Sequence, residues 1–233
     1  MNIEVVPVLN DNYVWLIRDE DEVFIVDPGE AAPVLKCLQE NNLRPVGVVL
    51  THYHADHVAG LGELLANYPS LTVYGPVEVA EFVNNVVGEG DSFTIFGETV
   101  QVLKTAGHTE EHISYLVGKH LFSGDALFMA GCGRVFTKDY AAQFDALQKF
   151  KNLANDTLVY AGHEYTLTNL NFALTVLEDV TVAKETIVSV TAKREHGQPS
   201  LPSTIGLERA INPFFQVETV DKFRELRNLR DIF

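Results

Sequence analysis

Short apolar runs separated by turn residues fill most of the chain up to about residue 165. Runs rich in Val, Ile, Trp and Tyr predict β-strands, because β-branched and aromatic side chains suit a pleated, half-buried surface. Between several of these runs, apolar residues recur at helical spacing and predict amphipathic helices. The predicted strands lie at residues 2–8, 13–18, 23–26, 46–50, 71–74, 93–96, 99–104, 112–117, 120–123 and 157–161. The predicted helices lie at residues 32–41, 58–68, 76–85 and 140–154.

The pattern changes after about Thr166. From there to the end we expect helices and no further strand, interrupted by the Pro- and Ser-bearing connection at residues 196–203. Mixed strands and helices followed by helices alone predict an α/β domain over residues 1–165 and a small helical domain over residues 166–233.

Composition narrows the class of partner. Seventeen Lys and Arg residues stand against thirty-two Asp and Glu residues, a formal net charge of −15. Such a surface repels phosphate backbones and anionic lipid head groups, so we expect neither a nucleic-acid nor a membrane partner. The two cysteines, Cys37 and Cys132, are too few for a disulfide scaffold. The start of the chain does not resemble a secretory signal, and no apolar stretch approaches the roughly twenty residues needed to span a bilayer, so we expect a cytoplasmic protein.

One short segment carries most of the candidate chemistry. His52, His54, Asp56 and His57 follow a predicted buried strand in the pattern His-x-His-x-Asp-His. Neutral imidazole and carboxylate are ligands that suit zinc, iron and manganese. Alternation places His52 and His54 on the same side of an extended chain, and Asp56 and His57 where the chain turns into a helix. The segment can therefore address two neighbouring metal ions.

Three further candidates, His108, Asp125 and His163, share a placement. Each follows the carboxyl end of a predicted strand behind a glycine, which permits a tight turn. If these strands are neighbours, the three side chains converge at one edge of the sheet. A lone histidine in such a place is more often structural, but the cluster at 52–57 needs outside ligands to complete its coordination. All seven residues together predict a site for two divalent ions bridged by a carboxylate.

Other polar residues receive no ligand role. His112, His120 and His196 lack the placement after a strand and a glycine, and we expect them on the surface or behind the ligands. Asp27 precedes Pro-Gly and is expected in a turn, with a hydrogen bond to a ligand imidazole as the alternative.

The donor set indicates hydrolysis. Two ions about 3.5–4 Å apart lower the pKa of a clamped water from about 15.7 towards 7 and polarise a carbonyl or phosphoryl oxygen. The sequence has no Gly-x-Ser-x-Gly elbow and no Gly-x-x-x-x-Gly-Lys phosphate loop. Metal-activated water is therefore the expected nucleophile, and Asp56 and Asp125 are the candidate catalytic residues that orient it.

Several segments resemble known families. THYHADH, AGHT, SGDALF and GHEY resemble motifs of the metallo-β-lactamase superfamily, and GCGRVF, HEYTLTNLNFAL and FRELRNLRDIF narrow the resemblance to glyoxalase II, the hydroxyacylglutathione hydrolases. The resemblance implies an α/β fold of αββα sandwich type with a small helical C-terminal domain that helps to hold glutathione. It also implies two metal ions, zinc with iron or manganese as alternatives. The implied reaction is hydrolysis of S-D-lactoylglutathione to D-lactate and glutathione, in methylglyoxal detoxification.

The resemblance also assigns residues by motif position. It implies one metal on His52, His54 and His108, the other on Asp56, His57 and His163, and Asp125 as the bridge. The implied glutathione contacts are Arg134, Tyr165, Arg227 and Arg230. Phe136 is a further substrate-binding candidate, but it stands where some members have Tyr, so a hydroxyl contact is absent there. Residues 137–139 read Thr-Lys-Asp where family members often have Glu-Gly-Thr, which leaves the shape of that loop in question.

Residue-level reasoning leaves alternatives open. Arg227 and Arg230 lie three apart on one helix face, which suits carboxylate recognition but also a solvated terminal helix. A persulfide dioxygenase shares a similar motif with a single iron, and oxygen uptake separates it from a hydrolase. A non-catalytic relative is expected to have lost ligands, and zinc β-lactamases commonly use Cys where this chain has Asp125. We expect a monomer whose partner is a small glutathione thioester.

Overall fold

The computed structural model describes residues 1–233, and the chain divides into two compact units. The first unit consists of Met1–Lys104 and Glu111–Gly118, and the second of Thr105–Glu110 and Lys119–Phe233. Each unit is made of two separate segments of the chain, so the boundary between the units does not fall at a single residue. The division into domains at residue 165 stays a prediction.

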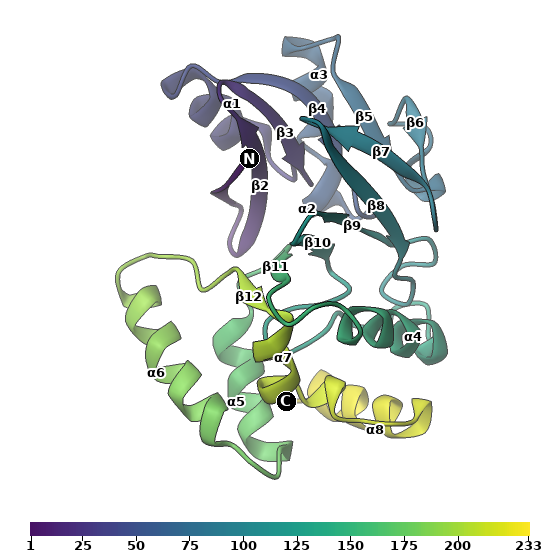
Figure 1. Cartoon of the computed structure of the whole chain (residues 1–233), viewed down its shortest axis with the longest axis vertical. Helices are drawn as coiled ribbons and strands as arrows, with labels where there is room; N and C mark the ends of the chain where they lie inside the picture. Colours follow the sequence, from purple (N-terminus) through teal and green to yellow (C-terminus); the bar gives the residue numbers. More distant parts are fainter. The chain divides into compact units, whose positions relative to one another are not determined.

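A mixed six-stranded sheet forms the centre of the first unit, in the order β1-β2-β3-β4-β5-β6 (Figure 1). The first three strands pair antiparallel and the remaining pairs are parallel. Val26 of β3 pairs with Val49 of β4, so the residues that follow these two strands lie at the same edge of the sheet. The strands are β1 (Asn2–Val8), β2 (Asn12–Asp19), β3 (Glu22–Val26), β4 (Arg44–Val49), β5 (Thr72–Gly75) and β6 (Asn85–Val86).

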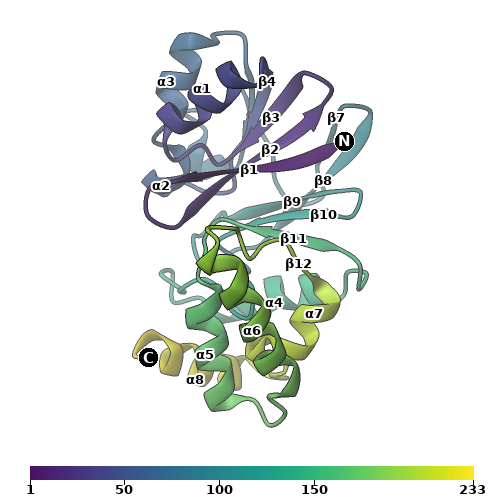
Figure 2. The same ribbon diagram turned by 90° about the vertical axis from the view of Figure 1, so that its left-hand side faces the viewer.

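Helices α1 (Ala31–Glu40) and α3 (Leu61–Asn67) pack on one face of this sheet (Figure 2). The core between them is aliphatic and includes Val34, Leu38 and Leu64, each at most 1% exposed. Burying one such side chain stabilises the fold by about 1.5–3 kcal/mol.

Two helix predictions in the first unit are wrong in detail. The helix expected at 58–68 is interrupted: α2 (Ala55–Val58) ends before Gly60, whose backbone N–H donates to Pro28 O at 2.9 Å, and α3 follows. A Cβ at Gly60 would lie 2.6 Å from the same oxygen, so this approach requires glycine. The helix expected at 76–85 is only the 3₁₀ turn η1 (Val77–Val79), because Asn84 accepts a hydrogen bond from Val73 N at 2.8 Å and returns the chain to the sheet as β6.

Three antiparallel strands complete the first unit: β7 (Ser92–Ile95), β8 (Glu98–Lys104) and β9 (Ile113–Val117). Aromatic contacts join them to the first sheet. Phe93 stacks on Tyr74 with ring centroids 3.9 Å apart, and the buried Tyr115 hydroxyl donates to Leu50 O at 2.7 Å. Burial raises the pKa of Tyr115 well above 10, so this hydroxyl remains a donor.

The second unit contains three short strands and the C-terminal helices. Strands β10 (His120–Gly124) and β11 (Leu158–Ala161) are parallel, and β12 (Ser203–Thr204) pairs with β11. Strand β12 lies where we expected none, because only two residues pair and so short a run has no sequence period. The helices are α4 (Tyr140–Lys151), α5 (Thr166–Val176), α6 (Thr181–Glu195), α7 (Ile205–Ile211), η2 (Pro213–Phe215) and α8 (Val220–Asp231).

Capping residues and aromatic packing define these helices. Asp139, Thr204 and Thr219 accept hydrogen bonds from the first-turn N–H groups of α4, α7 and α8. Helices α5 and α6 lie side by side (Figures 1 and 2). The buried ring of Phe223 on α8 contacts the buried ring of Phe214 on η2, with ring centroids 5.8 Å apart. None of the helices combines the length and apolar character required to cross a membrane.

Candidate metal centre

Four predicted ligands lie together in the first unit, directly after β4. His54 is the N-cap of α2 with extended backbone, so His52 and His54 belong to extended chain while Asp56 and His57 lie in the first helical turn. His52 Nε2 lies 3.0 Å from His54 Nδ1, and His57 Nε2 lies 3.7 Å from Asp56 Oδ2. The side chains of one short segment thus present nitrogen and oxygen donors to a common region.

Asp27 anchors the back of this group. It follows β3 with a positive φ of 49°, and its carboxylate accepts hydrogen bonds from Thr51 Oγ1 at 2.6 Å and from His57 Nδ1 at 3.0 Å. Because Thr51 gives its only hydroxyl proton to Asp27, it accepts from His52 Nδ1 at 2.9 Å. Both buried histidines are therefore fixed in the tautomer whose Nε2 carries the lone pair. Asp27 therefore accepts a hydrogen bond from a candidate ligand, which is the alternative given for it by the sequence.

His112 packs against a candidate ligand. We expected it on the surface or behind the ligands; it is fully buried, and its ring centroid lies 4.9 Å from that of His52. The next residue, Ile113, donates its backbone N–H to Thr51 O at 3.0 Å, which brings the two segments together. Only knowledge of that pairing reveals the contact, and no local motif signals it.

The other three predicted ligands lie together in the second unit. Gly162 N donates to Gly124 O at 3.0 Å, so β10 and β11 end side by side, and Asp125 and His163 follow them. Asp125 Oδ2 lies 3.4 Å from His108 Nε2 and 3.3 Å from His163 Nε2.

The tautomer of His108 is fixed in the same way as those of His52 and His57. Its Nδ1 donates to Arg134 O at 2.9 Å, so its Nε2 carries the lone pair toward Asp125. Two acceptors at this separation repel each other unless a proton or a cation lies between them. The arrangement therefore fits a bound cation.

The donor sets of both units fit divalent metal ions. They consist of imidazole nitrogens and carboxylate oxygens, and such sets bind zinc, iron or manganese. In His52, His57 and His108 the Nδ1 atom donates a hydrogen bond, which leaves Nε2 as the atom that can bind a metal ion. His52, His57 and Asp27 also place donor atoms within 4.8 Å of one another, although Asp27 faces the rear nitrogens.

Two aromatic candidates for substrate binding lie against candidate ligands. The Tyr165 ring stacks parallel to the His163 ring with centroids 4.7 Å apart. The Phe136 ring lies 5.3 Å from the His108 ring, and the Arg134 guanidinium lies 5.8 Å from the Phe136 centroid. These contacts place apolar surface next to the donors of the second unit.

The three candidate arginines differ in exposure. Arg227 is only 5% exposed and donates to Cys132 O at 2.7 Å and to Asp231 Oδ1 at 2.9 Å, so it does not belong to a solvated face. The exposed Arg134 donates to the same Asp231 oxygen at 3.2 Å. Arg230 donates twice to Asn169 Oδ1, at 3.3 and 3.1 Å, and burial lowers the pKa of its guanidinium from the ordinary value. Asp231 and Asn169, which the sequence did not single out, organise these cations.

The unusual segment at 137–139 has a structural role of its own. Thr137 Oγ1 donates to Gly107 O at 2.7 Å, next to His108, and Asp139 caps α4. Lys138 between them has a positive φ of 63°. The segment therefore links the turn before His108 to the start of α4.

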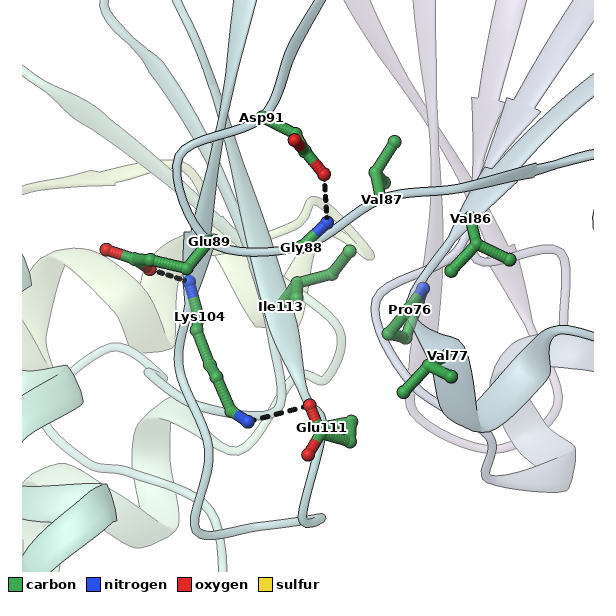
Figure 3. A pocket seen from close by; sticks show the side chains of 10 residues that line it. All are labelled: Pro76, Val77, Val86, Val87, Gly88, Glu89, Asp91, Lys104, Glu111 and Ile113. Carbon is green, nitrogen blue, oxygen red and sulfur yellow. Dashed lines mark hydrogen bonds and ion pairs between the residues drawn. The ribbon is translucent and has the colours of Figure 1, made fainter.

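A separate hollow of about 170 Å³ in the first unit contains none of the candidate residues (Figure 3). Val77, Val86 and Ile113 give it apolar walls. Lys104, which also lines it, forms an ion pair with Glu111, with 2.7 Å between Nζ and Oε2. The hollow is distinct from both groups of donors.

Comparison with known proteins agrees with this chemistry. Residues 9–163 match the family model of the metallo-beta-lactamase superfamily, and residues 164–233 match that of the hydroxyacylglutathione hydrolase C-terminus. The chain is 48% identical over 232 residues to the hydroxyacylglutathione hydrolase of Haemophilus ducreyi, covering 99% of each chain. It is 48% identical over 234 residues to that of Actinobacillus pleuropneumoniae serotype 5b, covering 100% of each.

Solved structures agree on the fold. ETHE1 from Myxococcus xanthus superposes with a TM-score of 0.76 at 27% identity, over 98% of this chain and 90% of the other. The B3 metallo-beta-lactamase BLEG-1 gives a TM-score of 0.71 at 22% identity, over 93% and 100%. The predicted fold class, a metallo-β-lactamase fold with a helical C-terminal domain, is confirmed.

Proposed function

Because the chain belongs to the hydroxyacylglutathione hydrolase family of the metallo-β-lactamase superfamily, we propose that it hydrolyses S-D-lactoylglutathione to D-lactate and glutathione. The family fold and the His/Asp groups imply a dinuclear metal site. The observation that carries the proposal is the set of oriented donors: the three histidines with fixed tautomers present Nε2 toward carboxylate or imidazole donors.

We propose a definite assignment of ligands. One ion would be held by His52, His54 and His108 and the other by Asp56, His57 and His163, with Asp125 as the ligand common to both. The close approach of His52 to His54 and of Asp56 to His57 supports the first-unit share of each set. The contacts of Asp125 with both His108 and His163 support its role as the bridge.

Divalent ions bound there would supply Lewis acidity and would lower the pKa of a bound water towards neutrality. The protein's share is orientation. Asn12 Nδ2 donates to Asp56 Oδ2 at 3.0 Å and fixes the carboxylate, which we propose accepts a hydrogen bond from the attacking water together with Asp125. The departing thiolate needs little help from a general acid, because the pKa of a thiol is about 8.5.

Positive charge gathered in the second unit supports glutathione as the carrier. Glutathione has two carboxylates, which a chain of net charge −15 repels except where cations are concentrated. Arg134, Arg227 and Arg230 form such a concentration near Asp231, and planar guanidinium groups suit carboxylates. We propose that these three, with Phe136 and Tyr165, bind the glutathione part of the substrate.

The test is an assay of thiol release. Zinc-loaded protein is given S-D-lactoylglutathione, a thioester without glutathione and a β-lactam, and oxygen uptake is followed with glutathione persulfide. We expect thiol release from the glutathione thioester at the highest kcat/KM and no oxygen uptake. Cleavage of only the other two compounds, or oxygen uptake with one iron per chain, contradicts the proposal and in the second case favours the persulfide dioxygenase.

The proposal extends to the identity of the metal, the oligomeric state and the location of the protein. We propose zinc as the metal, with iron or manganese as the alternatives, a monomeric state and a cytoplasmic location. Elemental analysis of purified protein and light scattering on a sizing column measure the first two. Two zinc ions per chain and a mass near 25.9 kDa are expected.

A further inference from the structure

The chain from Ala126 to Arg134, which we call the 126–134 loop, connects two proposed functional residues. It begins directly after Asp125 and ends at Arg134. Inside it, Phe128 and Gly131 exchange two backbone hydrogen bonds of 3.0 Å, and Ala130 has a positive φ of 57°. The loop is therefore a tight turn whose shape determines where its two ends lie.

Two fully buried side chains from α7 and its C-cap hold the tip of this loop. Ala130 N donates to Glu208 Oε2 at 2.9 Å, and Asn212 Nδ2 donates to Gly131 O at 3.0 Å. The two residues also bind each other, since Asn212 Nδ2 lies 3.0 Å from Glu208 Oε2. Ser203 Oγ donates to the other carboxylate oxygen at 2.5 Å.

The Glu208 carboxyl group is fully buried, and burial of such a group costs free energy. Burial raises the pKa of Glu208 to about 7, although three hydrogen bonds lower it. Burying a polar group costs free energy unless each of its atoms is hydrogen bonded, and here both oxygens are. The carboxyl group is thus held by the same contacts that hold the loop.

A third side chain links the loop to a proposed substrate cation. Asn169 Nδ2 donates to Met129 O at 3.2 Å, while its Oδ1 accepts from Arg230. The loop tip and Arg230 are therefore joined through one buried amide.

The far end of the loop presses on proposed ligands. A Cβ at Gly133 would lie 2.0 Å from Asp125 O and 2.9 Å from His108 Nδ1, so the backbone of Gly133 packs directly against both residues. Arg134 O accepts the Nδ1 proton of His108. A shift of the loop would therefore displace Arg134 O, which accepts from His108, and would move the backbone of Asp125.

We propose that Glu208 and Asn212 are positioning residues for the hydrolysis: by holding the tip of the 126–134 loop they place Asp125, His108 and Arg134 for the metal ions and the substrate. The inference rests on the proposed function. Neither residue contacts the proposed ligands, and each acts through the loop backbone. Partners behind metal ligands typically matter by 10–100-fold in metal affinity or activity.

The test compares three variants with a matched control. E208A removes the anchor of Ala130, N212A removes the donor to Gly131, and E208Q keeps an oxygen that accepts from Ala130 while its amide donates to Ser203. The control is V190A, which shortens a buried side chain of α6, outside the 126–134 loop, α7 and its C-cap. Metal content, the visible spectrum of the cobalt-substituted protein, melting temperature, kcat and KM are measured for all.

We expect E208A and N212A to lower kcat/KM by about 10–100-fold, to lose metal more readily and to shift the cobalt spectrum. E208Q recovers most of the activity and the wild-type spectrum. V190A lowers the melting temperature but leaves kcat and the spectrum unchanged.

Wild-type kcat/KM and spectrum in both E208A and N212A overturn the inference, and so does an equal loss in V190A. Failure of E208Q to recover activity and spectrum also overturns it. If E208A does not fold, N212A decides the question with the carboxyl group in place. A wild-type protein that fails to cleave S-D-lactoylglutathione defeats the proposed function instead, and the cobalt spectra of E208A and N212A then decide the positioning inference on their own.

Discussion

The two groups of candidate metal ligands are built in different ways. In the first unit one segment, His52 to His57, supplies four donors, and Asp27 and Thr51 at the same sheet edge fix two of its rings. In the second unit His108, Asp125 and His163 come from three distant segments, and a loop held by α7 supports two of them. The donors of the first group all come from one short segment, whereas those of the second group are brought together by tertiary packing.

This difference predicts where the molecule is vulnerable. A change near the first group acts through single hydrogen bonds to a ligand ring. A change in the second group acts through a loop, so we expect residues remote in sequence from the donors to affect it as well.

The largest effect is expected at the proposed bridge. D125A removes the carboxylate that faces both His108 and His163, so it should lose metal and reduce kcat/KM by more than about 100-fold, beyond the effect of any partner behind a ligand. Elemental analysis and the thioesterase assay measure both. Full metal retention would remove Asp125 from the bridge.

A pH-dependent contribution to stability is expected from Glu208. Burial raises its pKa from the ordinary 4.5 to about 7 in the folded protein, so this contribution is greatest below pH 4.5 and falls as pH rises to about 7, by about 1.4 kcal/mol per unit. Above that pH the loss is constant. The total is on the order of 3 kcal/mol relative to E208Q, which has no such titration. Urea unfolding of both proteins from pH 4.5 to 8 measures the gap, and a gap that does not change with pH refutes the prediction.

Removing the anchor of the first group should have an intermediate effect. D27N keeps the volume but exchanges a carboxylate acceptor for an amide that binds His57 Nδ1 less strongly. We expect metal affinity to fall by about 10-fold in D27N and up to about 100-fold in D27A. Competition with a chelator measures the affinity, and unchanged affinity in D27A shows that the ring orientation does not depend on Asp27.

The smallest effect is expected at the exposed cation. R134A removes a half-exposed guanidinium, so KM should rise by about 3–10-fold with kcat and metal content unchanged, as expected for an interaction made equally in ground and transition states. R227A should raise KM as well and also lower the melting temperature, because Arg227 is buried against Cys132. A fall in kcat without a change in KM for R134A contradicts its role as a substrate contact.

What the sequence predicts follows the same division. His-x-His-x-Asp-His is local, so its spacing predicts both the extended and the helical part, and the turn at Asp27 suggested a partner for a ligand ring. The strand ends before Asp125 and His163 were also predictable, because each carries an apolar run and a glycine.

Contacts between distant segments were not predictable. His112 approaches His52 because Ile113 pairs with Thr51, and Glu208 reaches Ala130 across seventy-eight positions of sequence. The lost helix at 76–85 has the same origin, since a side-chain contact of Asn84 with β5 overrides the local pattern. The spacing of Arg227 and Arg230 predicted a shared helix face. It could not predict that Arg227 is buried, because that depends on what α8 packs against.

The central claim is that seven side chains hold two metal ions. Anomalous diffraction from crystals of the zinc-loaded protein, measured on both sides of the zinc absorption edge, tests it directly. The account predicts two peaks about 3.5–4 Å apart, with Asp125 between them and three of the other six residues on each. A single peak, or peaks away from these residues, contradicts it.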